Sequence, residues 1–459
     1  MNDFFVSLML LGAVSSGGQM PFWEYSNQYD LMPRTSGYSA VFNTGMSYDG
    51  TKTFQWHWGL SAALRGDSFD RAAFIPDQAY AGVKWRCLSL DMGMKHPYAL
   101  YYGSSRTLGS LSSTSGNIIM SGNARSMPGY TLSLHPVDFP WTKGHLQIAG
   151  AFGDYLMTDA RFEGRTLTHN TQLYLIGHFG RFSLTLGIDH WAQWKGTGFA
   201  DYLRVITGSS AGSGGSQSDR MNVIGNQLGA EKIALSYRGE GWTAGFRHDI
   251  PYDDKSGMRF KNFPDGVNTL SFSFDDKDRL VSDIVYEFQY TMWQSGPVHD
   301  PETDEHGNPV PWHPGLNFDG RDNYFNNGEF RSGWTHYGMT IGDPLFFPVG
   351  TRDGSWNRGI TLGVENNRLR AHHLGLSGKI ARRLPYRLMA TYSLNSGTYG
   401  SEFRPALRQF SFGFNCEVPL VKAALTLVPG LYFDDGEVLK NAFGATLGIR
   451  YVFRNNLTI

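Results

Sequence analysis

The chain has 459 residues, a formal net charge of -1 and only 18% charged residues, and 14% of its residues are aromatic. Its lysines and arginines are scattered, so it lacks the concentrated basic surface that nucleic-acid binding requires. Mean hydropathy is -0.32, and beyond the N-terminus no apolar run reaches about 18 residues, which excludes transmembrane helices. The remaining way to cross a bilayer is a closed β-barrel, whose polar lumen keeps mean hydropathy low.

The chain begins with a short apolar run at residues 4–14, followed by Ser-Ser-Gly-Gly. The length of this run suits an export signal better than a membrane-spanning helix. The residues before it lack the usual lysine or arginine, and Asp3 is contrary to the pattern. We therefore expect an atypical export signal over 1–18, followed by a single domain over 19–459.

Alternation with a period of two recurs along the rest of the chain. In the last clear strand, 441–453, large residues such as Phe443 and Tyr451 alternate with small or charged ones such as Gly444 and Arg450. An apolar face toward lipid and a polar face toward a wet lumen are typical of a membrane barrel. The same pattern predicts about 18 strands, an even number as such barrels prefer. They lie at 38–48, 53–65, 78–87, 88–95, 129–136, 144–152, 171–178, 182–190, 230–238, 241–249, 268–275, 279–292, 357–366, 368–381, 385–394, 407–418, 422–434 and 441–453.

Four segments are too long to be hairpin turns: 97–128, 191–229, 250–267 and 293–356. Long irregular segments in a compact domain are usually functional or disordered, and the last of these is rich in aromatic residues. We expect any helices to be short and to lie in these segments. The predicted fold is therefore all-β, a transmembrane antiparallel barrel of about 18 strands, with long loops and short helical elements plugging the lumen.

Short motifs follow one another in a distinctive order through the chain. They lie at 21–24, 121–128, 190–194, 222–226, 253–257, 262–266, 287–291, 294–296, 322–328, 333–335 and 341–345. The most distinctive is Asp-Asn-Tyr-Phe-Asn-Asn-Gly at 322–328. Taken together, from residue 21 to about residue 455, the chain resembles the Wzi-type capsule assembly proteins of Gram-negative outer membranes.

This resemblance implies an 18-stranded outer-membrane barrel with helical elements plugging its periplasmic end. It also implies a monomeric surface lectin that holds capsular or surface polysaccharide on the cell, surrounded by outer-membrane lipid and in contact with capsule export machinery. The chain departs from the usual barrel pattern in one respect, because it runs past the aromatic Phe453 to residue 459.

No catalytic or metal-binding motif stands out. There is no G-x-S-x-G, no H-E-x-x-H and no glycine-rich phosphate loop, so we predict a non-enzymatic protein without cofactor or bound metal. His372 and His373 are adjacent on a strand and point to opposite faces. The acidic segment 300–308 could hold calcium, but its spacing is not that of a known calcium loop. Cys87 and Cys416 are expected to be apolar strand residues rather than a disulfide pair.

Two other functions stay open. Polar inward faces also suit a porin or a substrate-specific channel. A glycosidase would need two carboxylates within about 5–10 Å. The inward-facing candidates for such a pair are Asp283, Glu287, Glu365 and Glu417, although a channel lumen contains such acids without being an enzyme.

Carbohydrate binding has its best candidates in one loop. Sugars stack their C–H faces on aromatic rings and bind planar amide and carboxylate groups with their hydroxyls. The loop 312–334 provides both kinds of group within one irregular segment. We predict that Trp312, Tyr324, Asn326, Asn327 and Trp334 contact the glycan. The competing interpretation is that these residues pack the loop into the barrel lumen.

Overall fold

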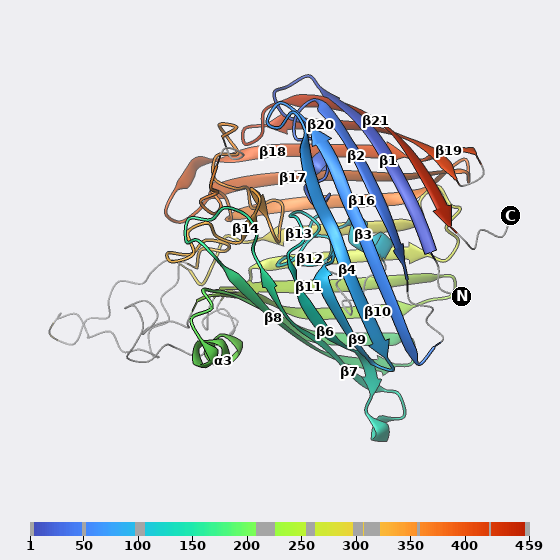
Figure 1. Ribbon diagram of the computed structural model, residues 1–459, viewed down its shortest axis with the longest axis vertical. Coiled ribbons are helices and arrows are strands. Elements are labelled where there is room, and N and C mark those ends of the chain that lie inside the picture. The colour runs from blue at the N-terminus through green and yellow to red at the C-terminus, as the bar shows by residue number, and fades with distance from the viewer. Residues whose placement is uncertain are drawn as a thin grey trace.

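The computed structural model describes residues 4–47, 52–96, 106–207, 225–253, 262–296, 306, 322–355, 359–421 and 424–454. Its strands form one closed antiparallel barrel (Figure 1). The strands of the wall are β1 (Phe4–Ser15), β2 (Gly37–Met46), β3 (Phe54–Gly66), β4 (Ala73–Trp85), β5 (Leu88–Met94), β6 (Pro128–Asp138), β7 (Leu146–Leu156), β8 (Leu167–Phe179), β9 (Phe182–Trp194), β10 (Asn226–Arg238), β11 (Trp242–Tyr252), β12 (Gly266–Phe274), β13 (Asp283–Tyr290), β16 (Leu369–Ile380), β17 (Leu384–Gly397), β18 (Glu402–Cys416), β19 (Val418–Val421), β20 (Leu425–Gly436) and β21 (Ala442–Arg454). The described residues include no helix that is long and apolar enough to cross a membrane.

Strand β1 closes the barrel. It pairs with β2 on one side and with β21 on the other, so the first and last strands are neighbours. Its exposed side chains, Leu8, Leu10 and Val14, alternate with the buried Leu11 and Ala13. The structure therefore places in the wall the segment for which the sequence predicted an export signal. The two interpretations were hard to separate because an apolar run of this length also suits a tilted membrane strand.

The predicted strand number of 18 is confirmed, although one predicted strand was wrong and one was missed. β18 and β19 occupy a single position in the wall, because both pair with β20. The segment 357–366 was predicted as a wall strand, but its described part lies outside the sheet, with one isolated bridge between Val364 and Pro348. Its alternation comes from a loop whose Ile360 and Leu362 are exposed. The missed strand is β1.

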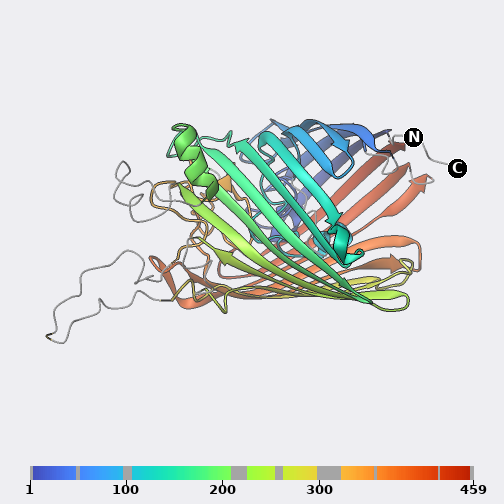
Figure 2. The ribbon, with the colours of Figure 1, turned by 90° about the horizontal axis from the view of Figure 1, so that it is seen from below.

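The two ends of the barrel differ in their connections. One end carries both chain termini and short hairpin turns such as 86–87, 180–181 and 381–383, and we call it the short-turn end. The other end carries the long connections, and we call it the long-loop end. Figure 2 shows the two termini together at one end and the long connections at the other.

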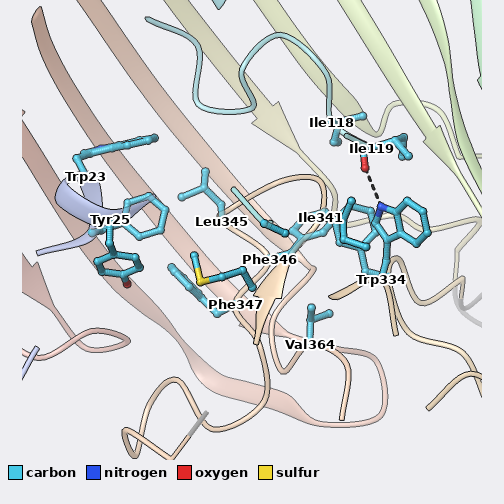
Figure 3. Close-up of a cluster of buried hydrophobic side chains, with 14 of the residues drawn as sticks. Trp23, Tyr25, Ile118, Ile119, Trp334, Ile341, Leu345, Phe346, Phe347 and Val364 are labelled. Carbon is cyan, nitrogen blue, oxygen red and sulfur yellow. Dashed lines mark hydrogen bonds between the residues drawn. The ribbon is translucent and has the colours of Figure 1, made fainter. Parts of the chain in front are cut away.

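Three long connections fold back into the barrel and fill part of it. Insert A is residues 16–36 with helix α1 (Phe22–Tyr25), insert B is residues 106–127 with helix α2 (Arg106–Leu111), and insert C is the described part of 322–368. Insert C contains the short hairpin of β14 (Thr335–His336) and β15 (Met339–Thr340). Their apolar side chains form one buried cluster inside the barrel (Figure 3). That cluster includes Phe22, Trp23, Tyr25, Ile118, Ile119, Trp334, Ile341, Leu345, Phe346, Phe347 and Val364.

Inserts A, B and C occupy the long-loop half of the lumen. On β1, the inward-facing Leu11 and Ala13 are buried, whereas the inward-facing Ser7, nearer the short-turn end, is only half-buried. On β17, the inward-facing Ser393 is buried and Arg387 is half-buried. The inserts therefore bury the inward-facing residues of the long-loop half. Toward the short-turn end burial varies, since Ser7 and Arg387 are half-buried while Gln55 and Asp283 are buried.

A buried ion cluster ties the inserts to one another and to the wall. The Asp30 carboxylate of insert A accepts hydrogen bonds from Arg34 Nε at 2.8 Å, Arg65 Nη1 at 2.5 Å and Arg125 Nε at 2.8 Å. Arg65 lies on β3 and Arg125 in insert B, and Arg34 Nη2 also donates to the Tyr337 carbonyl of insert C at 3.1 Å. Burial alone would raise the pKa of Asp30, but the three guanidiniums hold it below its usual value.

Asp30→Asn is expected to lower the free energy of unfolding by about 3–5 kcal/mol, because it leaves the buried Arg34 and Arg65 and the half-buried Arg125 without the Asp30 carboxylate. Denaturant unfolding of the barrel in detergent measures this change. The matched control is Asp276→Asn, whose partner Arg382 is 3.5 Å away in an exposed pair, and it should change little.

The same ion cluster gives the stability a pH dependence. Because the folded-state pKa of Asp30 is lowered, its contribution is present above the unfolded pKa of about 3.9 and is lost as the pH falls through the folded value. The wild type and Asp30→Asn should therefore converge at low pH. An Asp30→Asn variant as stable as Asp276→Asn at neutral pH would contradict this role.

Candidate functional site

The aromatic residues predicted to stack on glycan are buried wherever the structure describes them. Trp312 lies outside the described residues. Trp334 is fully buried, donates from Nε1 to the Ile119 carbonyl at 2.7 Å, and packs against Trp191 with ring centroids 5.5 Å apart (Figure 3). Tyr324 is also buried, and its hydroxyl donates to Asp265 at 2.9 Å. Neither ring offers a free face to a ligand in this structure.

The two predicted asparagines hold the backbone of insert C. Asn326 bonds Val364 in both directions, donating to its carbonyl at 3.0 Å and accepting from its amide at 2.8 Å. The Asn327 side chain accepts from the amides of Glu329 and Phe330. Their side-chain groups therefore serve the fold, and a direct glycan contact by either residue stays a prediction.

Other aromatic rings near the long-loop end lie beside arginines. In four pairs a guanidinium carbon lies 3.7 to 4.6 Å from the centroid of an aromatic ring. The pairs are Arg125 with Tyr337, Arg331 with Phe162, Arg352 with Phe403, and Arg368 with Tyr399. Such pairs leave part of a ring open while placing a cationic hydrogen-bond donor beside it.

Two of these pairs lie together, and we call Phe162, Arg331, Tyr337, Arg125 and Asp159 the rim site. Phe162 and Asp159 of this site lie in the loop 157–166 between β7 and β8, and Arg161 holds that loop in place. The buried Arg161 guanidinium donates to the Thr335 carbonyl at 2.6 Å and to the Gly333 carbonyl at 2.7 Å. The next residue, Phe162, therefore has a fixed backbone and a ring that is 52% exposed.

A tight hairpin turn places the second ring of the rim site. Tyr337 and Gly338 connect β14 to β15 with φ values of 51° and 79°. Two positive φ values are required by a type I′ turn, which matches the twist of a hairpin and favours glycine. The Tyr337 amide donates to Asp159 at 3.2 Å and its hydroxyl to the Thr158 carbonyl at 3.2 Å. The ring is 36% exposed, so this tyrosine is held in place but still accessible.

Beneath the rim site lies an imidazole without contact to solvent. His336 accepts at Nε2 from the Thr158 amide at 3.1 Å and donates from Nδ1 to the Arg125 carbonyl at 3.0 Å. Burial lowers the pKa of His336. A neutral imidazole suits this pattern of one acceptor and one donor. His336 therefore joins loop 157–166 to insert B, and the rim site rests on a fixed base.

The chemistry of the rim site suits sugars better than catalysis. Partly open rings can stack on sugar C–H faces, and the arginine and aspartate side chains can bind hydroxyl or carboxylate groups. The described residues contain no group of three His, Cys, Asp or Glu side chains that could hold a metal ion. The rim site therefore has the groups of a surface-binding site.

The acids considered as a glycosidase pair are each occupied by other groups. Glu287 is buried and accepts from Ser112 Oγ at 2.6 Å and from the Ser113 amide at 2.7 Å, so it holds the end of helix α2. Glu417 pairs with Arg450 at 2.6 Å at the short-turn end. Asp283 binds Lys277 at 2.5 Å, and Glu365 accepts from the Arg352 amide at 3.0 Å. Each of the four carboxylates therefore has a partner within the fold.

The rim site was not predicted from the sequence because its rings are isolated in short segments. A usable signal was nevertheless present. Phe162 stands between Arg161 and Glu163, and Tyr337 precedes a glycine in a Tyr-Gly turn between two short polar runs. The predicted site lies in the densest aromatic stretch instead, and a high density of aromatic residues is equally typical of a packed insert.

Trp334→Ala is expected to destabilise the barrel by about 3–5 kcal/mol, because it empties a fully buried indole site and leaves the Ile119 carbonyl without its donor. Thermal unfolding in detergent measures the loss. Phe162→Ala is the matched control, since truncating an exposed ring should change the melting temperature little. Equal melting temperatures for both variants would show that Trp334 is not a packing residue.

No protein-family model matches the chain, and no curated protein matches it. Among solved structures it is similar to Wzi, an outer-membrane protein involved in group 1 capsule assembly in Escherichia coli and a carbohydrate-binding β-barrel. The identity is 14% and the TM-score 0.57, over 97% of this chain and 84% of that one. It is also similar to OccK1 (OpdK) of Pseudomonas aeruginosa, with 10% identity and a TM-score of 0.50, over 99% and 98% of the two chains. These likenesses concern the fold, which is that of an outer-membrane β-barrel.

Proposed function

We propose that the protein is a non-enzymatic outer-membrane lectin that binds capsular or surface polysaccharide and helps to attach or assemble it at the cell surface. One observation carries this proposal. The long-loop half of the lumen is filled by inserts A, B and C, and the rim site presents partly exposed rings beside arginines at that same end. A filled barrel with such an end suits binding better than transport.

The orientation follows from a general property of outer-membrane barrels, which have short periplasmic turns and longer extracellular loops. The short-turn end, with both termini, then faces the periplasm, and the rim site faces outward. In this orientation the helical inserts enter the barrel from the outside. The resemblance had implied a plug at the periplasmic end, so the proposal differs from it here.

The fold likeness to Wzi supports the proposal, since that protein is described as carbohydrate-binding and involved in capsule assembly. The proposed partners are surface polysaccharide, the lipid around the barrel and capsule export machinery on the periplasmic side. We propose that the protein acts as a monomer, because the barrel closes on itself through β1 and β21.

A porin or substrate-specific channel is the second candidate function. The observation that favours it is that Arg387 and Ser7 face the lumen in its short-turn half and are only half-buried. The filled long-loop half argues against it, because a solute would have to displace a packed apolar cluster to pass.

Purified wild-type protein in a planar bilayer is expected to show no large, stable open pore, because the inserts occupy the long-loop half of the lumen. Single-channel conductance measures this directly. A known open porin purified in the same detergent is the control for insertion. A large, stable conductance of the wild type would favour the channel function. It would also show that the inserts do not block the lumen in a bilayer.

Phe162→Ala and Tyr337→Ala are each expected to weaken binding of the protein to surface polysaccharide, because each removes one partly open stacking ring. The expected cost is about 1 kcal/mol or more per ring, which is roughly a fivefold loss, and multivalent attachment of a polymer would magnify it. Glycan-array binding of the purified variants measures it.

The matched control is Trp141→Ala, an exposed aromatic residue at the short-turn end of the barrel.

In cells, deletion of the protein should release polysaccharide into the medium while its synthesis continues, and the two ring variants should reproduce part of that release. Polymer retention equal to the wild type in both ring variants would place the glycan site elsewhere. Loss of polymer synthesis on deletion would indicate a biosynthetic or export role.

A further inference from the structure

Helix α3 (Phe199–Thr207) lies outside the barrel, against β8 and β9 near the long-loop end (Figure 2). A polar network fixes it there. The Tyr202 hydroxyl donates to Asp154 of β7 at 2.7 Å, and His169 of β8 donates to the same carboxylate at 2.9 Å. The Tyr202 ring packs against Trp194 of β9 with centroids 5.3 Å apart. One side of the short helix is therefore attached to the wall.

A second side of α3 is apolar and exposed. Phe199 is 75% exposed and Leu203 is 47% exposed. The two residues are four positions apart and so share one face of the helix. At 100° per residue, Asp201 and Arg204 fall on the opposite face, where their side chains pair at 3.1 Å. The helix thus has a wall-facing side, an apolar side and a charged side.

Along the barrel, α3 lies at the edge of the apolar belt, by which we mean the exposed apolar residues on the outer surface of the wall. Its contacts on the wall, Asp154, His169 and Trp194, lie within the last three residues of β7, β8 and β9 at the long-loop end. Toward the short-turn end, the outer faces of β8 and β9 carry exposed apolar residues such as Leu173 and Leu186. The apolar side of α3 is therefore at the border of the surface that faces lipid.

At the other edge of the apolar belt, on the same side of the barrel, lies an exposed aromatic residue that corresponds to Phe199. Trp141 lies in the short helix η1 (Pro140–Thr142), which connects β6 to β7 at the short-turn end, and it is 77% exposed. Figure 1 shows α3 and the β6–β7 connection at opposite ends of neighbouring strands. The intervening strands have 11 to 13 residues, which matches a tilted strand crossing a bilayer. Exposed aromatic residues at both ends are typical of the two membrane–water interfaces.

We propose that α3 is an interfacial membrane anchor that inserts Phe199 and Leu203 into the lipid leaflet at the long-loop end of the barrel. Its charged side then faces the head groups, where Arg204 and Asp201 stay hydrated. An amphipathic helix lying in the interface has this division of faces. The occupant of the apolar side is lipid because that side continues the lipid-facing surface of β8 and β9. This inference does not depend on polysaccharide binding.

Site-directed spin labelling in proteoliposomes tests the anchor. Single cysteines are introduced as Phe199→Cys and Leu203→Cys in a chain whose native cysteines are replaced by Cys87→Ser and Cys416→Ser. Power saturation then compares access of oxygen, which partitions into lipid, with access of a water-soluble nickel chelate. Leu173→Cys is the lipid-exposed reference and Asp353→Cys the water-exposed one, since both side chains are exposed but on different surfaces.

Both helix positions are expected to give an oxygen-to-nickel ratio several-fold above that of Asp353→Cys and close to that of Leu173→Cys. A ratio like that of Asp353→Cys would show that α3 stands in water and would overturn the proposal. Low access for both reagents would also overturn it, by showing that protein, such as a second copy of the chain, covers the apolar side. Barrel folding is checked by the heat-dependent shift of the band on a gel, and Leu203→Cys alone decides the test if Phe199→Cys does not fold.

Discussion

The structure depends on one constraint, which is that every backbone N–H and C=O group of the wall must be paired without help from water. Closure of the sheet satisfies it, and the pairing of β1 with β21 is the step that removes the last two edges. The alternation of apolar and polar side chains along each strand then follows, because a closed wall has one face toward lipid and one toward the lumen. The same constraint explains why an apolar N-terminal run is needed in the wall of this chain.

The lumen imposes a second requirement on the inserts. Segments that fold into a barrel lose their contact with water, so their polar groups need partners inside. Asp30 with its three arginines, and Glu287 with Ser112 and Ser113, provide such partners between insert and wall. The apolar residues of the same inserts share one core cluster. Filling the long-loop half in this way gives the loops that carry the rim site a rigid support.

Strand periodicity was strong enough for the sequence to predict the barrel, its strand number and the segments that leave the wall. It failed where two structures share one pattern. Residues 4–14 have the length of both a signal and a strand, and Ile360 and Leu362 alternate in a loop. The rings of Tyr324 and Trp334 are buried in the insert, and the sequence could not show this because a packed insert and a glycan site use the same residue types. Their contact with glycan stays a prediction. Which rings stay exposed depends on how Arg161 and the Tyr337 turn place them, and the local signals for this, the charged neighbours of Phe162 and the Tyr-Gly turn, are weaker than a dense aromatic stretch.

The central claim is that inserts A, B and C fill the long-loop half of the lumen. Ser7 and Ala13 test it most directly, because both face the lumen from the same strand, β1, on either side of the proposed boundary. In a Cys87→Ser, Cys416→Ser background, labelling of the folded barrel with a charged, water-soluble maleimide should modify Ser7→Cys readily and Ala13→Cys much more slowly. Equal, rapid labelling of both positions would show an open lumen and contradict the account.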